Sequence, residues 1–204
     1  MGLLAPSVSI TRYKVEGKLK APVTQTVEHA LKQYVISDSD DAASDKVVGW
    51  TSFENPYQPD FSGSSFVFGT AFVFTLRIDK KTIPSKIVQK NFILEMNRML
   101  QKSGRTYLGR DEKKMLKDRV INALSQRIPA TPHLYDVVWH YDEARLWFYS
   151  NLKSANEALE TLFLKSFKCV LLRLFPYMLA DQESGLSDSN RDRLTKLSST
   201  TIRP

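Results

Sequence analysis

The sequence is poor in the residues that build redox and metal centres. It contains one cysteine and three histidines in 204 residues, and the cysteine, Cys169, lies in an apolar run. A single cysteine excludes an intramolecular disulfide and a cysteine-rich zinc site. None of His29, His133 and His140 has a partner at the spacing of a metal motif such as His-Glu-x-x-His. We therefore expect no metal or other cofactor, and a reducing compartment such as the cytoplasm.

Long hydrophobic runs and common catalytic motifs are also missing. The longest candidate for a membrane segment, residues 65–76, is too short for a helical span, which needs roughly 20 residues. The N-terminus lacks the order of basic, apolar and small residues that marks a signal peptide. The sequence has no phosphate-binding loop, no Gly-x-Ser-x-Gly elbow and no dinucleotide fingerprint. These absences predict a protein without membrane contact and without enzymatic activity.

Positive charge is in excess, and it is unevenly distributed. The formal net charge is +7, and residues 77–127 hold 14 cationic and 5 acidic side chains, which leaves +9 there and −2 elsewhere. A solvated helical face explains many lysine-rich helices, but charge concentrated on one element favours a polyanionic partner such as duplex DNA. We interpret this segment as the DNA-binding element, with contacts from Arg77, Lys80, Lys81, Lys86, Lys90, Arg98, Lys102, Arg105, Arg110, Lys113, Lys114, Lys117, Arg119 and Arg127.

The acidic residues leave two other functions open. Residues 37–45 hold four carboxylates but lack the glycine and terminal glutamate of a calcium loop, so they predict a solvated loop. A nuclease would need rigidly held carboxylates, for which Asp79, Asp111, Glu112 and Asp118 are the candidates. Asp111 and Glu112 stand at the start of a helix, where a favourable interaction with the helix dipole already explains them. A metal-dependent exonuclease and a protein-binding module with an acidic partner remain as alternatives.

The hydrophobic periodicity predicts an α+β fold with antiparallel sheets. Alternating apolar residues predict strands at residues 7–15, 134–140, 144–149 and 169–174, and another that begins at Val47. Residues 65–78 predict either two strands that pivot near Gly69 or one long bent strand. Helical spacing predicts helices at 22–35, 84–104, 111–129 and from Ser154, where Glu157 would complete a capping box. The three tryptophans, Trp50, Trp139 and Trp147, lie in strand patterns, which favours packing in the core or sheet over base stacking.

The order of these elements predicts four regions. The two helices at 84–104 and 111–129 are joined by a short glycine-containing connection, which indicates an antiparallel, protruding helical hairpin. The regions are an N-terminal α+β sheet region (1–78), the basic hairpin (79–130), a second ββαβ sheet region (131–180) and a mobile tail (181–204). The tail has few apolar anchors.

Four motifs follow one another along the chain, at residues 49–50, 72–89, 114–127 and 154–162. Residues 72–89 (FVFTLRIDKKTIPSKIVQ) resemble the strand, basic turn and Pro-Ser step that precede the first long helix in the family of the recombination-associated protein RdgC. Residues 114–127 (KMLKDRVINALSQR) resemble its second helix, and residues 154–162 (SANEALETL) resemble a later one. Gly49-Trp50 is similar to the Gly-Trp/Phe pair near its N-terminal sheet. Together the resemblance runs over residues 8–175.

The resemblance implies a cytoplasmic, nucleoid-associated protein that binds duplex DNA without strong sequence preference. Such a protein restrains recombinase filaments in recombination or replication control, and a recombinase is an implied partner. Members of the family form a homodimeric ring with a basic inner surface, to whose closure the hairpin contributes. The chain resembles a short member that lacks the usual C-terminal part, so we expect an open dimer or another oligomer in place of that ring.

Overall fold

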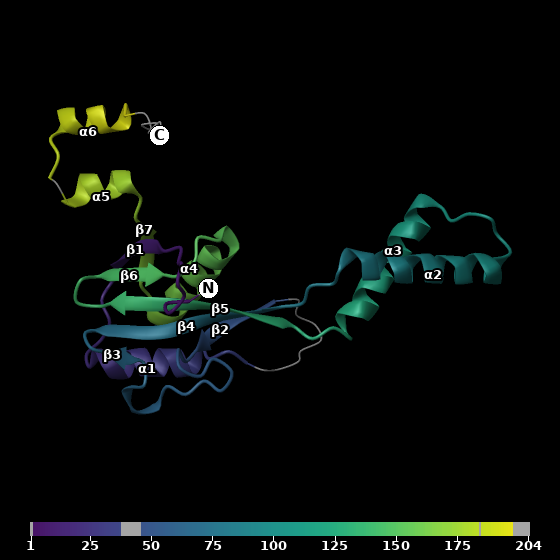
Figure 1. Ribbon diagram of the computed structural model, residues 1–204, viewed down its shortest axis with the longest axis horizontal. Helices are drawn as coiled ribbons and strands as arrows, with labels where there is room; N and C mark the ends of the chain where they lie inside the picture. The colour runs from purple at the N-terminus through teal and green to yellow at the C-terminus, as the bar shows by residue number, and fades with distance from the viewer. Residues whose placement is uncertain (1, 38–45, 184, 198–204) are drawn as a thin grey trace.

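A curled antiparallel sheet forms the centre of the molecule (Figure 1). The computed structural model describes residues 2–37, 46–183 and 185–197. The strand order is β2-β4-β5-β6-β1-β7, with β3 paired to β4. The strands are β1 (Thr11–Glu16), β2 (Lys46–Thr51), β3 (Val67–Phe68), β4 (Ala71–Lys80), β5 (Thr131–His140), β6 (Arg145–Phe148) and β7 (Val170–Arg173). The predicted α+β class with antiparallel pairing is confirmed.

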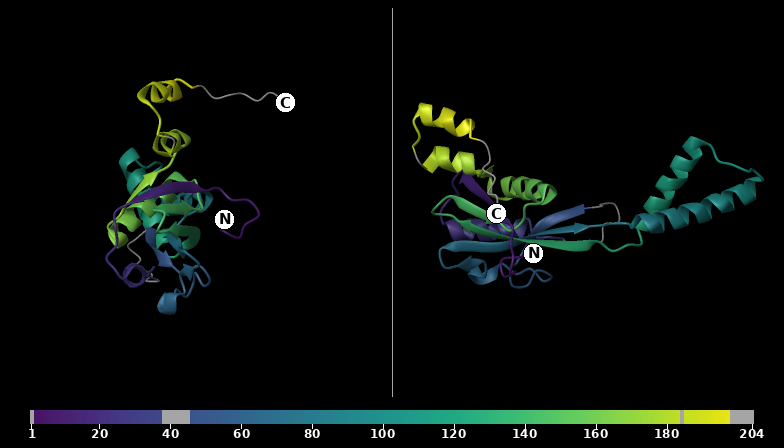
Figure 2. Two further views of the ribbon diagram at one scale, coloured as in Figure 1. Left: turned by 90° about the vertical axis from the view of Figure 1, so that its left-hand side faces the viewer. Right: turned by 45° about the horizontal axis from the view of Figure 1, so that its top comes forward.

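Six α-helices accompany this sheet in the described residues. They are α1 (Val23–Gln33), α2 (Ser85–Ser103), α3 (Arg110–Ser125), α4 (Lys153–Phe167), α5 (Pro176–Glu183) and α6 (Asp188–Thr195), with a short 3-10 turn, η1 (Ser62–Ser64). α1 and α4 pack on one face of the sheet, whereas α5 and α6 stand away from it (Figure 2). No helix in the described part of the chain is long and apolar enough to cross a membrane.

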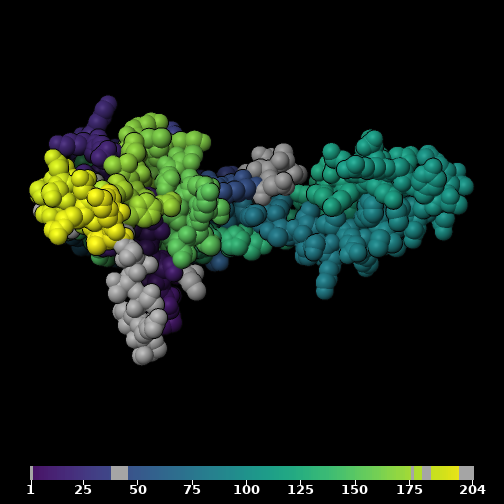
Figure 3. Space-filling view, turned by 90° about the horizontal axis from the view of Figure 1, so that it is seen from above, coloured from purple at the N-terminus to yellow at the C-terminus, as the bar shows by residue number. Residues whose placement is uncertain are grey.

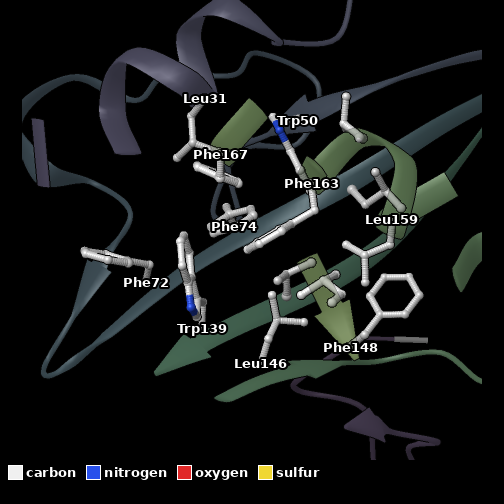
Figure 4. Close-up of a cluster of buried hydrophobic side chains, with 14 of the residues drawn as sticks. Leu31, Trp50, Phe72, Phe74, Trp139, Leu146, Phe148, Leu159, Phe163 and Phe167 are labelled. Carbon is white, nitrogen blue, oxygen red and sulfur yellow. The ribbon is translucent and has the colours of Figure 1, made fainter. Parts of the chain in front are cut away.

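An aromatic core lies between the sheet and the two helices on its covered face (Figure 4). Trp139 of β5 packs edge-on against Phe163 of α4, with ring centroids 4.9 Å apart. Trp50 of β2 meets Phe74 of β4 at 5.0 Å in a similar T-shaped arrangement. Both indoles are completely buried, which confirms the predicted packing of Trp50 and Trp139. This cluster joins the sheet to the helices on its covered face.

The Gly-Trp pair of the sequence has a clear structural reason. The backbone around Ile36 runs against β2, because Ile36 N–H donates to Trp50 O at 2.8 Å and Trp50 N–H donates to Tyr34 O at 2.9 Å. A Cβ atom at Gly49 would lie 2.5 Å from the Ile36 Cα atom. Only glycine lets the two backbones approach this closely, and Trp50 then enters the core beside it.

The opposite face of the sheet is covered over one half only. There the N-terminal residues cross the sheet, and Leu3 N–H donates to the buried Asp136 carboxylate at 2.7 Å. Leu3 and Phe53 pack against a small apolar cluster that includes Val73 and Val138. The other half, toward β6, β1 and β7, carries exposed side chains, among them Trp147, which is 37% exposed. The prediction that Trp147 is packed in the sheet is therefore only partly correct.

Three local predictions differ from the structure or fall outside it. α4 begins at Lys153 after Leu152, without a side-chain cap, so the predicted capping box at Ser154 is wrong. The Asn156 side chain donates to Leu152 O at 2.8 Å, and the same carbonyl also accepts the backbone N–H groups of Ala155 and Asn156. The segment predicted to be a tail contains α6 and the end of α5, although its mobility remains a prediction. The predicted acidic loop at 37–45 lies, apart from Ser37, outside the described residues.

Candidate nucleic-acid interface

α2 and α3 form a helical hairpin that projects from one end of the sheet. The hairpin is inserted between β4 and β5, which are adjacent strands paired up to Lys80 and Thr131. A space-filling view shows it joined to the body by a narrow neck (Figure 3). The two helices pack against each other, and α3 leads back toward the sheet (Figure 1). Its surface is therefore open to a large partner on several sides.

The connection between the helices is ordered by its glycines and by one carboxylate. α2 ends at Gly104, which adopts a left-handed conformation with φ of 65° that glycine accepts without strain. Gly109 N–H donates to Glu112 Oε2 at 2.9 Å, and Arg105 pairs with the same carboxylate at 3.0 Å. These hydrogen bonds lower the pKa of Glu112, and the bond from Gly109 has the largest effect. Glu112 thus supplies the helix-start role expected of it, as a cap for α3.

The packing of the hairpin is uneven between its two helices. Leu116 and Val120 of α3 and Leu108 of the connection are nearly inaccessible, and they form its internal seam. α2 has no buried residue over its 19 positions, and Ile87, Ile93 and Leu94 are 40–47% exposed. An apolar helix face left in water is a common mark of an interaction surface.

The hairpin carries most of the predicted DNA-binding cations on its surface. Ten of them are exposed on α2, the connection or α3: Lys86, Lys90, Arg98, Lys102, Arg105, Arg110, Lys113, Lys114, Lys117 and Arg119. Arg127 is exposed just beyond α3, and Lys80 and the half-buried Lys81 lie at the neck. The structure thus brings 13 of the 14 predicted side chains to the hairpin and its neck.

Arg77 is set apart from this group. Its side chain is 10% exposed in β4, and Nε and Nη2 donate to the two Asp79 carboxylate oxygens at 2.8 and 2.7 Å. The guanidinium also lies over the Tyr57 ring, with the Arg77 Cζ atom 5.8 Å from the ring centroid. Arg77 and Asp79 are two residues apart on a strand, so they share one face and form this pair locally. We therefore remove Arg77 from the candidate interface.

Three neighbouring lysines of α3 form a compact cationic group. Lys113, Lys114 and Lys117 lie within about one helical turn on the same side of α3. No acidic side chain of the described residues forms an ion pair with any of the three, whereas Arg98 pairs with Glu95 at 2.6 Å and Arg105 with Glu112. These three lysines are available to an anionic partner.

The carboxylates that a metal-dependent nuclease would need have other contacts or lie apart. Asp79 is engaged by Arg77, and Glu112 is engaged by Gly109 and Arg105. Asp111 and Asp118 are exposed and lie about two turns apart along α3. Among the residues that the structure describes, no three His, Cys, Asp or Glu side chains gather into a metal-binding group.

One exposed group was missed by reasoning from the sequence. Arg12, Arg145 and Trp147 lie on the uncovered half of the sheet, because β1 and β6 are paired and Arg12 stands opposite Trp147. The signal was present as Arg-x-Trp at 145–147 and Arg-x-Lys at 12–14, since alternate residues of a strand share a face. The pairing of these two distant strands was needed to bring the residues together.

The sheet and its basic arm define an α+β protein built to present a charged helical hairpin. A family model described as "Putative exonuclease, RdgC" matches residues 9–177. The chain belongs to the RdgC family and is a recombination-associated protein, as the order of its motifs predicts. No curated protein matches the chain.

Proposed function

We propose that this RdgC family member binds duplex DNA without sequence preference through its helical hairpin. The observation that carries the proposal is the gathering of ten exposed cations on an arm that stands clear of the body. Contacts from lysine and arginine to phosphates release counterions, and they supply affinity and position without reading base identity. Through this binding the protein would associate with the nucleoid and restrain recombinase filaments.

The dimensions of the hairpin suit a duplex. α2 has 19 residues, so it is about 28 Å long at a rise of roughly 1.5 Å per residue. A duplex of that length carries roughly 16 phosphate charges on its two strands. The hairpin can therefore engage several phosphates at once, which gives binding that is strong at low salt and weak at high salt.

We further propose that the protein is not an enzyme. Asp79 and Glu112, two of the four acidic residues that a nuclease site would use, are held by guanidinium and backbone donors of their own elements. The exonuclease named in the family description is the main rival, and one assay separates the two functions. Labelled duplex DNA is incubated with the protein, with and without Mg²⁺ or Mn²⁺, and both migration and nucleotide release are measured.

The expected result is a shifted duplex that stays intact under all conditions. A double variant, Asp111→Asn with Asp118→Asn, serves as the control because both side chains are exposed and lie on the hairpin. Metal-dependent nucleotide release by the wild type that disappears in this variant would overturn the proposal in favour of a nuclease. Neither a shift nor degradation would instead favour a module that binds an acidic protein.

We also propose that the protein forms a homodimer through the apolar face of α2. The sheet does not cover this helix, so Ile87, Ile93 and Leu94 need a second subunit to leave water. We expect a dimeric mass by light scattering at micromolar concentration, and a shift toward monomer in an Ile87→Lys, Ile93→Lys double variant. The control is Val170→Lys, at a residue 46% exposed on β7. A wild-type protein that is monomeric over this range would contradict the proposal.

A further inference from the structure

Strand β6 is much shorter than its neighbour β5, and this difference leaves an opening in the sheet. β6 lies between β5 and β1 and covers four residues, whereas β5 covers ten. Just after β6, Tyr149 N–H still donates to Asp136 O of β5 at 3.0 Å. The chain then turns toward α4, and Ser150 N–H donates to Phe148 O at 2.8 Å. In the described part of the chain, β5 therefore continues toward the hairpin with no strand beside residues 131–135 on this side (Figure 1).

The opening has the width of one strand. Neighbouring strands lie about 4.8 Å apart, so β5 and β1 are separated by about 10 Å where β6 lies between them. Beyond the end of β6, a groove of about 470 Å³ occupies the corresponding place. Residues 132–135 of β5 form one wall of this groove, and Ser9 and residues 149–152 line the rest of it. We call this groove the strand slot.

The backbone of β5 presents hydrogen-bonding groups to the strand slot. Successive residues of an antiparallel strand direct their N–H and C=O groups to alternate sides. Asp136 O faces the β6 side because it accepts from Tyr149, so both backbone groups of Leu134 face that side too. Pro132 O does the same, and a proline is tolerated inside a strand where its missing N–H faces an open edge. Among the described residues, no hydrogen bond uses Leu134 N–H, Leu134 O or Pro132 O on this side.

The side chains around the strand slot are uncharged and largely apolar. Leu134, Tyr135, Tyr149 and Leu152 line it, and the described residues of its lining include no Lys, Arg, Asp or Glu. Leu152 is 53% exposed, and Ile10, which follows the lining residue Ser9, is 43% exposed. Apolar side chains beside an open strand edge are typical of a place where another strand pairs. A lining without cations offers no partner to phosphates, which argues against nucleic acid in the slot.

We propose that the strand slot binds an extended peptide segment of a partner protein as an additional strand. The segment continues the line of β6, so it runs antiparallel to β5. Its backbone accepts from Leu134 N–H and donates to Leu134 O and Pro132 O, which only an extended polypeptide can do at strand spacing. Its side chains are uncharged and are β-branched or aromatic, to match the lining. The proposal rests on the sheet and is independent of duplex binding by the hairpin.

An unbiased peptide library supplies the probe for this site. Random hexapeptides displayed on phage are selected on the full-length protein, and the enriched sequences are synthesised with a fluorescent label. Their binding is then measured by fluorescence anisotropy. We expect enriched sequences rich in Val, Ile, Thr and aromatic residues, without proline and without charge at their centre. A selection that enriches no sequence, or that enriches mainly acidic sequences, would contradict the proposal.

Leu134→Pro removes the one N–H group that the protein offers to the peptide backbone. We expect it to weaken peptide binding by about tenfold or more, because a hydrogen bond is lost and the proline ring enters the slot. The matched control is Leu134→Ala, which shortens the same side chain but keeps the N–H group. This control should bind the peptide at least about fivefold more tightly than Leu134→Pro. Equal affinities of the two variants, with folding intact by circular dichroism, would overturn the proposal.

Amide hydrogen exchange of the wild-type protein reports on the same contact without any variant, so it decides the question even if Leu134→Pro unfolds. Saturating peptide should slow exchange at Leu134 by about tenfold or more. His133 and Tyr135 direct their N–H groups to β4, so their rates should stay unchanged. Unchanged exchange at Leu134 would contradict the proposal. So would equal slowing by duplex DNA or by a higher protein concentration without peptide, since these would assign the slot to nucleic acid or to a second copy of the chain.

Discussion

A protein with Lys113, Lys114 and Lys117 all changed to glutamine is expected to lose duplex affinity on the order of tenfold or more at low salt. The three side chains are exposed and without ion pairs among the described residues, so their loss removes phosphate contacts without disturbing the packed seam. Each lost contact should flatten the slope of log affinity against log salt by roughly 0.9. The loss should be the same for all duplex sequences, because phosphates carry no base identity.

The matched control changes Lys18, Lys20 and Lys165 to glutamine. These three lysines are also exposed, but they lie on the body of the protein, outside the hairpin. Both variants remove the same charge, so a purely global electrostatic effect would weaken them equally. Fluorescence anisotropy over a range of salt concentrations, with folding checked by circular dichroism, distinguishes the two cases. Equal losses would mean that the hairpin is not the binding surface.

Replacing Asp79 with alanine is expected to lower the free energy of unfolding by about 3–5 kcal/mol. Arg77 is nearly buried, and both Asp79 oxygens accept its hydrogen bonds, so the variant would remove two charge-assisted hydrogen bonds from a nearly buried guanidinium. A double variant with leucine at both positions should recover much of the loss, because it buries no charge. Urea unfolding of the two variants and the wild type measures these differences.

Asp118→Ala is the control for this prediction. Asp118 is an exposed carboxylate of α3, and its removal should change stability by less than about 0.5 kcal/mol. An Asp79→Ala protein as stable as Asp118→Ala would show that the Arg77–Asp79 pair contributes little. The same result would reopen Asp79 for a chemical role, which its contact with Arg77 now argues against.

The sequence predicts the elements of this fold better than their arrangement. Alternating residues locate most of the strands because a sheet with one covered face needs an apolar residue at every second position. Gly69, with φ of 61°, separates β3 from β4, so the two-strand interpretation of residues 65–78 is confirmed. The pairing of β1 with β6 and β7 depends on contacts between residues more than 130 positions apart, which periodicity does not encode.

The candidate interface shows the same division between local and distant information. The charge of the hairpin is visible in the sequence because its cations follow one another along two consecutive helices. A count of charges along the sequence places Arg77 in the interface. The count does not show that Asp79 lies on the same face of β4 and pairs with Arg77. Arg12 and Trp147 were missed as a group because only the finished sheet makes them neighbours. Helix α4 starts at Lys153, one residue before its predicted cap at Ser154, and its N-cap residue is Leu152, which has no side-chain cap hydrogen bond.

The hairpin assignment is tested most directly by mapping which lysines duplex DNA protects. The protein is acetylated briefly with and without saturating duplex, and modification at each lysine is measured by mass spectrometry. The hairpin assignment predicts strong protection of Lys86, Lys90, Lys113, Lys114 and Lys117, all exposed in the free protein, and unchanged rates at Lys18, Lys20 and Lys165. Protection spread equally over both groups, or confined to the body, would contradict DNA binding by the hairpin.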